Sequence, residues 1–434
     1  MSTHFKRIQR LFLHWFGETA LSETEQLAQR LKAIPSTTYQ GLRCSSRVTP
    51  QAIQRRWDRL CKRSGHSDIQ RILWQEPKVQ NAPPDTAYQA NIENYIGTVQ
   101  VPVGLAGPLR IQGLHAQGDY YLPLATTEAA LVASYNRGAQ AIGLAGGCQA
   151  ALLNEGIQRS PGFVFNNLGE VGLFVSWILT QEASMKAVAE STTRHGQLQD
   201  IAFAVEGNHV YLTLDFLTGD AAGQNMVTIA SEAVCHYLIN HSPVPPKRHY
   251  VEANFSGDKK ASALAFTGVR GKKVTAEVLL PAAIVEKVLQ TTPQAMADYW
   301  QMSALGSVQS GALGAQGHYA NGLAALFIAT GQDVACVAEA AVGLTRMSLD
   351  ENGHLYTAVT LPSLAVGTVG GGTHLPTQQA CLQILGLAGP GNARALAEVC
   401  AGMALAGELS IIAALAAGHF TQAHQRLARQ RKTP

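Results

Sequence analysis

Hydrophobic and polar positions change their spacing several times along the chain, and each change predicts a different element. From residue 90 to about 113, apolar and polar side chains alternate between Gly and Pro residues, as in β-strands. In TTEAALVASYNRGAQAIGLAGG, apolar side chains recur at helical spacing. We expect Thr126 or Thr127 to cap this helix and Glu128 to open it. The glycines after Ile142 would close it.

A compact order of elements is predicted between residues 161 and 254. The segments are a strand GFVF, a helix from Leu168 to about Ser191, strands DIAFAVE and HVYLTLDF, a helix AAGQNMVTIASEAVCHYLIN and a strand RHYVEAN. This β-α-β-β-α-β order is typical of ferredoxin-like domains. We therefore interpret residues 161–254 as a small domain inserted into a larger one.

The rest of the chain favours helices. Residues 1–85 are the most charged part of the chain, and their pattern is typical of helices. They end at NAPPD, so they predict an N-terminal helical region. Residues 86–160 and 255–418 form the predicted large domain. After residue 255 it consists of alanine-rich helical segments and the glycine-dense loop VGTVGGGTH. Residues 419–434 form a tail. The predicted fold class is α+β, with a helix-rich large domain.

Composition narrows the classes of function. Charged residues make up 15% of the 434 residues, against roughly 25% in an average soluble domain. The net charge of +3 is spread along the chain, which argues against nucleic-acid binding. Seven cysteines form no CxxC pair and no metal-like spacing, so we expect a cytoplasmic protein with reduced thiols and no metal. Glu408 interrupts the most apolar stretch, which we interpret as a buried helix and not a membrane span.

Four ionisable side chains stand out from their surroundings. Glu128 lies in ATTEAALVAS; it is either an ordinary first-turn acid or, if shielded from water, a proton donor. Asp333 in IATGQD would on its own be a helix cap. Lys259 could belong to a surface turn, but lysine also stabilises negative charge that develops on a carbonyl oxygen. His424 is either an exposed tail histidine or an acid for a leaving thiolate.

Two glycine-containing loops complete the candidate chemistry. TGDAAGQNMVT leads from a strand into a helix, where backbone N–H groups bind phosphate. GTVGGGT lets a ligand approach the backbone closely. Neither is the GxGxxG fingerprint of a Rossmann domain. From the residues alone, the chain is an oxidoreductase or an acyl-transfer enzyme.

Seven collinear segments resemble the signature segments of 3-hydroxy-3-methylglutaryl-CoA (HMG-CoA) reductases, closest to the class I form. They are ENYIGTVQVPVGLAGPL, ATTEAALVAS, GDAAGQNMVT, DKKASA, IATGQD, LPSLAVGTVGGGTHLPTQQACLQILG and AGELSIIAALAAGH. The likeness covers residues 90 to about 426. It implies reduction of HMG-CoA by NADPH to mevalonate and free CoA, in two hydride transfers through a hemithioacetal and an aldehyde.

The resemblance also implies roles for single residues. Lys259 would stabilise the oxyanion and Glu128 would protonate the aldehyde oxygen. Asp333 would hydrogen-bond to both, and His424 would protonate the departing CoA thiolate. Arg194 would bind the 2′-phosphate of NADPH. The other implied cofactor-binding residues are Asp220, Ala221, Ala222, Gly223, Gln224, Asn225, Gly370, Gly371, Gly372 and Thr373.

For the substrate, Arg159, Asp258 and Lys260 match the family's carboxylate-binding residues. His318 and Asn321 match positions that line the active site and the CoA channel.

Two substrate positions depart from the family pattern. Glu252 stands where the family has a serine, and Met302 where it has a lysine. A glutamate ~4 Å from a substrate carboxylate would cost on the order of 4 kcal/mol at an effective dielectric of 20. Glu252 therefore points away, or the alignment slips locally, or the substrate has no free carboxylate there.

The resemblance further implies a homodimer or homotetramer. Two alternatives remain: the same redox chemistry on another acyl thioester, and a non-catalytic relative that binds CoA or a nucleotide.

Overall fold

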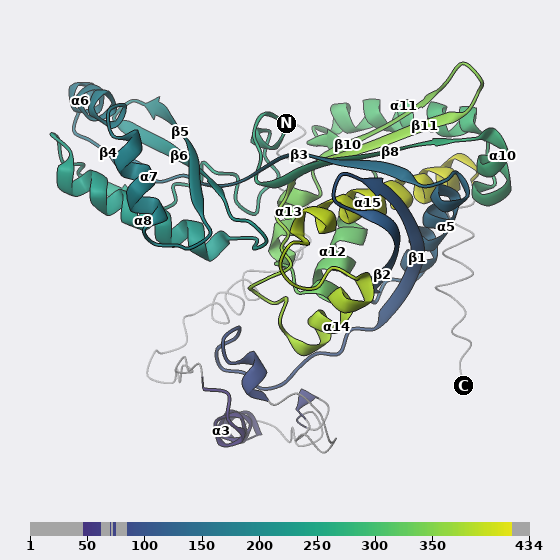
Figure 1. The fold of residues 1–434 in the computed structure, drawn as a ribbon, viewed down its shortest axis with the longest axis horizontal. Coiled ribbons are helices and arrows are strands. Elements are labelled where there is room, and N and C mark those ends of the chain that lie inside the picture. The colour runs from purple at the N-terminus through teal and green to yellow at the C-terminus, as the bar shows by residue number, and fades with distance from the viewer. Residues whose placement is uncertain (1–46, 62–69, 71–72, 75–84, 419–434) are drawn as a thin grey trace, which may run out of the picture.

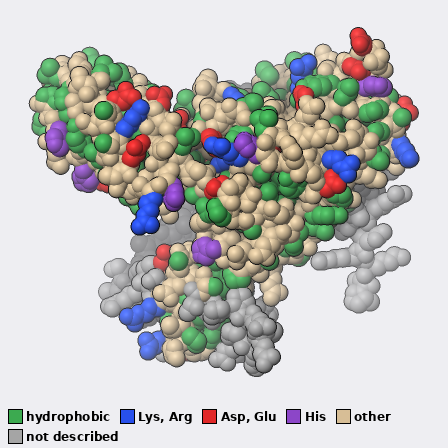
Figure 2. Space-filling model, viewed as in Figure 1, with side chains coloured by type: hydrophobic (Ala, Val, Ile, Leu, Met, Phe, Trp, Pro, Cys, Tyr) green, Lys and Arg blue, Asp and Glu red, His purple; other side chains and the backbone are tan. Residues whose placement is uncertain are grey.

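The computed structural model describes residues 47–61, 70, 73–74 and 85–418. Figure 1 shows a small lobe that stands apart from a larger body, with strand β3 running between them. The tail that contains His424 lies outside the described residues, as does most of the predicted N-terminal helical region. The face drawn in Figure 2 intersperses acidic and basic side chains, and no continuous basic surface covers it.

The larger body is built on a mixed sheet. The strands are β1 (Val103–Gly113), β2 (Gln117–Ala125), β3 (Cys148–Arg159), β8 (Gly271–Leu280), β9 (Gly314–Ala315), β10 (Gly343–Leu349) and β11 (Leu355–Leu364). β1 pairs with β2 and with β3, and the sheet continues β3-β8-β11-β10-β9. In β10 and β11 buried and less buried positions alternate, because one face of this sheet is covered by helices. The prediction of alanine-rich helices after residue 255 was wrong for strands β8, β9, β10 and β11.

Helices cover the sheet and supply most of the core. The helices of the body are α5 (Leu131–Leu144), α9 (Leu264–Thr267), α10 (Ala282–Ile284), α11 (Pro293–Ser310), α12 (Tyr319–Thr330), α13 (Val337–Ala340), α14 (Pro376–Leu385) and α15 (Ala393–Ala416). A π-turn, η3 (Val285–Leu289), and a 3₁₀ turn, η4 (Val334–Cys336), lie between them. Before the body come α3 (Pro50–Cys61) and the 3₁₀ turn η2 (Asp85–Tyr88).

Helix α15 is the central core helix. By length and composition it could cross a membrane, but 83% of its most apolar window is buried inside the protein. Its two carboxylates are buried and satisfied. Glu398 accepts hydrogen bonds from the backbone N–H groups of His115, Ala116 and Leu152. Glu408 accepts from the N–H groups of Gly317 and His318 and from a threonine hydroxyl. The predicted buried helix is confirmed.

The small lobe has the predicted order of elements. It consists of β4 (Gly162–Val164), α6 (Leu168–Ile178), α7 (Glu182–Glu190), β5 (Gln197–Glu206), β6 (His209–Leu217), α8 (Gln224–His241) and β7 (Arg248–Tyr250). The helix predicted from Leu168 to about Ser191 is two helices, α6 and α7. The strands form an antiparallel sheet in the order β7-β4-β6-β5. The domain limits remain a prediction.

One strand belongs to both sheets. β3 pairs with β8 up to Gly156 and then with β6 from Ile157 to Arg159. Gly271, the first residue of β8, pairs with Gly156. Arg159 and Arg270 therefore lie at the junction of the two sheets, and both are buried.

Candidate active site

Lys259 and Asp333 meet as predicted from the sequence. The Lys259 ammonium group lies 2.8 Å from the Asp333 carboxylate, and the two side chains are 40% and 43% exposed. This hydrogen bond raises the pKa of Lys259, although desolvation partly opposes the shift. Asp333 also caps η4 by accepting the N–H of Ala335, so the capping interpretation is confirmed, while its catalytic role stays a prediction. A pair this exposed contributes only about 0–1 kcal/mol to folding.

The backbone is strained on both sides of the predicted chemistry. Lys259 has φ +55° and Ala130 has φ +69°, in the left-handed region that suits glycine. Such strain is typical of functional sites. Ala130 lies between Glu128 and the start of α5 at Leu131, so Glu128 does not open the helix. Thr126 accepts the N–H of Glu128 but caps no helix; the predicted capping was wrong, because the chain makes a turn before α5 begins.

Glu128 has a different partner from the predicted one. Its two carboxylate oxygens accept hydrogen bonds from the side-chain amide of Asn321, at 3.1 and 2.9 Å. Glu128 is exposed and lines a small cavity with His318 and Asn321. Within the described residues of this single chain, no hydrogen bond or ion pair joins Glu128 to Lys259 or Asp333. The predicted three-residue contact is thus formed for one pair only.

Arg159 lies between two carboxylates in the predicted substrate site. Its guanidinium lies 3.0 Å from Asp258 and 3.5 Å from Glu252. Glu252 also accepts hydrogen bonds from the N–H of Ser160 and the hydroxyl of Ser256. Glu252 therefore points inward and brings a second carboxylate to Arg159; the outward orientation is excluded. Lys260 is exposed and donates to the backbone oxygen of Asp258.

Two residues of this charge network were missed in the sequence. Arg270 donates to Glu339 at 2.7 Å and also forms an ion pair with Asp258. Glu339 in turn accepts the backbone N–H of Lys259 at 3.1 Å. Burial raises the pKa of Glu339 to about 7, although Arg270 acts against the shift. Only their apolar surroundings, VAEAAVG and FTGVRG, could have singled them out.

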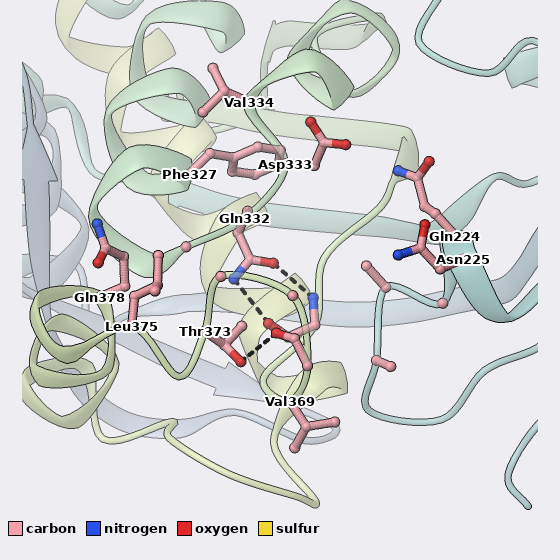
Figure 3. Close-up of a pocket in the computed structure, with 18 of the residues that line it drawn as sticks. Gln224, Asn225, Phe327, Gln332, Asp333, Val334, Val369, Thr373, Leu375 and Gln378 are labelled. Atoms are coloured by element: carbon pink, nitrogen blue, oxygen red, sulfur yellow. Dashed lines mark hydrogen bonds between the residues drawn. The ribbon is translucent and has the colours of Figure 1, made fainter. Parts of the chain in front are cut away.

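A cavity of about 610 Å³ opens between the two predicted ligand loops. All the predicted cofactor residues line it except Asp220 and Arg194, and Asp333 lines it as well. In Figure 3, Gln224 and Asn225 form one wall and Leu375 and Gln378 the opposite one. Arg194 is exposed in the small lobe, in the turn after α7.

The two loops are fastened to each other. Residues 221 and 369 form a parallel bridge, and the N–H of Thr368 donates to the backbone oxygen of Asp220 at 2.9 Å. A side chain at Gly367 would collide with the backbone of the other loop, so only glycine permits this approach. The Asp220 carboxylate accepts the N–H groups of Gly391 and Ala393 where α15 begins. Asp220 thus anchors the loop and does not line the cavity.

The cavity suits an anionic ligand. Helix α8 begins at Gln224 without a side-chain cap, behind Gly223 at φ +77°. Its first N–H groups are therefore available to a phosphate at the cavity wall. Gly370 and Gly371 have open space where a Cβ would stand, so their backbone is accessible. Among the described residues, no group of three His, Cys, Asp or Glu could hold a metal.

Comparison with known proteins decides the family. The family model for hydroxymethylglutaryl-coenzyme A reductase matches residues 52–429. The chain belongs to the HMG-CoA reductase family. A reductase from Aeropyrum pernix is 47% identical over 348 residues, which cover 79% of this chain and 82% of that protein. One from Pyrococcus abyssi is 41% identical over 396 residues, covering 89% and 93%.

A solved structure shares the fold of this HMG-CoA reductase. The class II reductase from Streptococcus pneumoniae bound to NADPH in open conformations aligns with a TM-score of 0.61 at 20% identity. The alignment covers 93% of this chain and 99% of the Streptococcus pneumoniae chain. The mixed α+β class is thereby confirmed. The family membership confirms the predicted activity: the protein is an oxidoreductase that converts HMG-CoA to mevalonate.

Proposed function

We propose that this HMG-CoA reductase uses NADPH and reduces the thioester beside the Lys259–Asp333 pair. One observation carries the proposal: Asp333, whose carboxylate lies 2.8 Å from the ammonium group of Lys259, lines the cavity where glycine loops and the uncapped N-terminus of α8 converge. A donor for an oxyanion and a site for a phosphate-containing ligand are thus adjacent.

The residues of the cavity fit NADPH. Gly223 and the first turn of α8 would hold a phosphate, and Gly370 and Gly371 would let the ligand approach their backbone. Bound there, the cofactor would supply the hydride for both reductions. Arg194 is proposed for the 2′-phosphate; its exposed place in the small lobe leaves it free to reach a ligand.

The chain's own groups handle charge and protons. Lys259 would donate a hydrogen bond to the thioester oxygen and stabilise the oxyanion of the hemithioacetal. Asp333 keeps that ammonium group charged and oriented, as the raised pKa of Lys259 indicates. Glu128, held by Asn321, would protonate the aldehyde oxygen. His424 is proposed to protonate the CoA thiolate.

We propose that a homodimer or homotetramer completes this site in the cytoplasm. Glu128 is exposed in the single chain, and α11 carries an apolar stripe of Met302, Leu305 and Val308, which are 66%, 59% and 74% exposed. A covered interface would shield both. Sedimentation velocity tests this: a monomer at micromolar concentration contradicts it.

Reduction of another acyl thioester in addition to HMG-CoA is a second candidate activity, and Glu252 favours it. Arg159 already faces two carboxylates, and Met302 supplies no charge at the second departing position. The alternative of a non-catalytic relative is not pursued, because the chain belongs to the HMG-CoA reductase family and the Lys259–Asp333 pair is formed.

Turnover with a series of 3-hydroxyacyl thioesters separates these candidates. Strict preference for HMG-CoA supports the first function. Turnover of a thioester without the distal carboxylate beside HMG-CoA supports the second, and absence of NADPH oxidation with every thioester contradicts the proposed use of NADPH.

A further inference from the structure

We propose that Glu339 is a positioning residue that holds the loop of Lys259 so that the ammonium group is directed at Asp333. The inference rests on the proposed catalytic role of Lys259. Glu339 does not line the cofactor cavity. Its carboxylate accepts a hydrogen bond from the backbone N–H of Lys259.

One short segment of the chain holds Lys259 at both ends. Asp333 precedes η4 and Glu339 belongs to α13, which follows η4 directly. Asp333 accepts from the Nζ of Lys259 at 2.8 Å, and the Oε2 of Glu339 accepts from its backbone N–H at 3.1 Å. These two contacts fix the start and the end of the same side chain. A displacement of Glu339 would therefore change the direction of the ammonium group.

Arg270 couples Glu339 to the residue before the lysine. Its Nη1 donates to Glu339 at 2.7 Å and its Nη2 to Asp258. Arg159 holds the other oxygen of Asp258 at 3.0 Å. Glu339 and Arg270 are only 2% and 4% exposed, so solvent competes little for these bonds.

This network opposes the strain at Lys259. Lys259 has φ +55°, a left-handed conformation that is unfavourable for a residue other than glycine. Charge-assisted hydrogen bonds to a buried carboxylate contribute more than neutral ones, so Glu339 and Arg270 can hold the loop against this strain. Without them we expect the loop to relax and the ammonium group to leave Asp333.

The charge of Glu339 responds to pH near neutrality. The groups that face it are Arg270, Asp258, Lys259 and Cys336. Burial is the largest influence and raises the pKa of Glu339 to about 7; the negative charge of Asp258 adds to the shift. Below that pH the protonated carboxyl group loses its charge-assisted bond with Arg270. The loop is then held less firmly, and kcat should fall on the acidic side.

The test compares Glu339→Gln with Glu398→Gln in the full-length protein. Glu398 is an equally buried carboxylate, but it binds the backbone around residues 115 and 152, away from the loop. Three quantities are measured: kcat from pH 6 to 9, the thermal midpoint, and the rate at which acetic anhydride labels Lys259. Labelling is followed by peptide mass spectrometry with Lys186 as the internal reference. It needs no turnover, so the inference and the proposed function can fail separately.

We expect Glu339→Gln to lower kcat at pH 8 by about 10–100-fold and to remove the acidic limb near pH 7. Labelling of Lys259 relative to Lys186 should rise several-fold, because an ammonium group that leaves Asp333 loses the hydrogen bond that raises its pKa. Glu398→Gln should lower only the thermal midpoint. Arg270→Lys keeps the charge but cannot bridge two carboxylates, so it should resemble Glu339→Gln. Unchanged kcat, pH profile and labelling in Glu339→Gln would overturn the inference, as would the same changes in Glu398→Gln.

Discussion

The ammonium group of Lys259 and the carboxylate of Asp333 form a 2.8 Å ion pair, and Asp333 lines the glycine-rich cavity. Because both side chains are about 40% exposed, the pair contributes little to folding. Its proposed value is chemical.

Asp333→Asn should therefore separate activity from stability. We expect kcat to fall by about 100-fold because the ammonium group loses its orientation, while the thermal midpoint changes little. The pKa of Lys259 should also fall, because its largest raising influence is the hydrogen bond to Asp333. Steady-state kinetics and calorimetry measure these effects.

Glu182→Gln is the matched control, because it breaks an exposed 2.7 Å ion pair with Lys186 far from the cavity. A similar loss of kcat in both variants would contradict the assignment of Asp333.

Asp220→Ala should weaken NADPH binding although Asp220 does not line the cavity. Its carboxylate accepts two N–H groups at the start of α15, and this anchors the loop that precedes α8. Loss of such a cap costs about 1 kcal/mol, so we expect the Kd for NADPH, read by fluorescence quenching, to rise about fivefold or more.

The control for Asp220 is Asn167→Ala, which removes the cap of α6 in the small lobe. It should lower stability and leave the Kd unchanged. Equal Kd values for Asp220→Ala and the unmodified protein would mean that the loop does not depend on this anchor.

Much of the fold could be predicted from local patterns in the sequence. The strands and helices between residues 161 and 254 have strong periodicity and clear turns, and the structure has them in the predicted order. Strands β8, β10 and β11 were missed, because a short apolar segment can belong to a strand or to a buried helix and the alanine-rich segments around them favoured helices.

Only part of the candidate site could be predicted from the sequence. Lys259 and Asp333 could be selected because each is a charge beside an apolar run. Glu339 and Arg270 are also charges in apolar surroundings, but their pairing could not be predicted, because it depends on a contact between distant segments at the junction of two sheets. The start of α5 was misplaced because the turn at Ala130 has no polar cap to mark it.

Glu252→Ser should improve the use of HMG-CoA if the distal carboxylate binds Arg159. Removing one carboxylate 3.5 Å from the guanidinium leaves Arg159 with more uncompensated charge. We expect the KM for HMG-CoA to fall about tenfold, while the KM for NADPH stays constant. Initial-rate kinetics with both substrates measure this. A higher KM for HMG-CoA would show that Glu252 is needed to shape the site and does not compete with the substrate.

Asp215→Asn should stabilise the protein above pH 6 and not at pH 4. Burial is the largest cause that raises the pKa of Asp215 to about 6, and one of its buried oxygens has no partner. A raised folded-state pKa means that the native state binds the proton more tightly, so this stability is lost as pH rises from 4 to 6. The variant avoids that loss, which we expect to be on the order of 1 kcal/mol. Urea unfolding at several pH values measures it.

Asp119→Asn gives the opposite sign as a control, because its hydrogen bond with Arg110 lowers the pKa of Asp119. That stability is present above the unfolded-state pKa and lost as pH falls. A pH-independent difference for Asp215→Asn would contradict the buried, protonated state.

The most direct measurement is the oxidation of NADPH at 340 nm by the purified protein with HMG-CoA, beside Lys259→Ala. The account predicts turnover that consumes two NADPH for each mevalonate, and a loss of kcat of about 1,000-fold in the variant. Equal rates in the two proteins, or no oxidation by the unmodified protein, would contradict it.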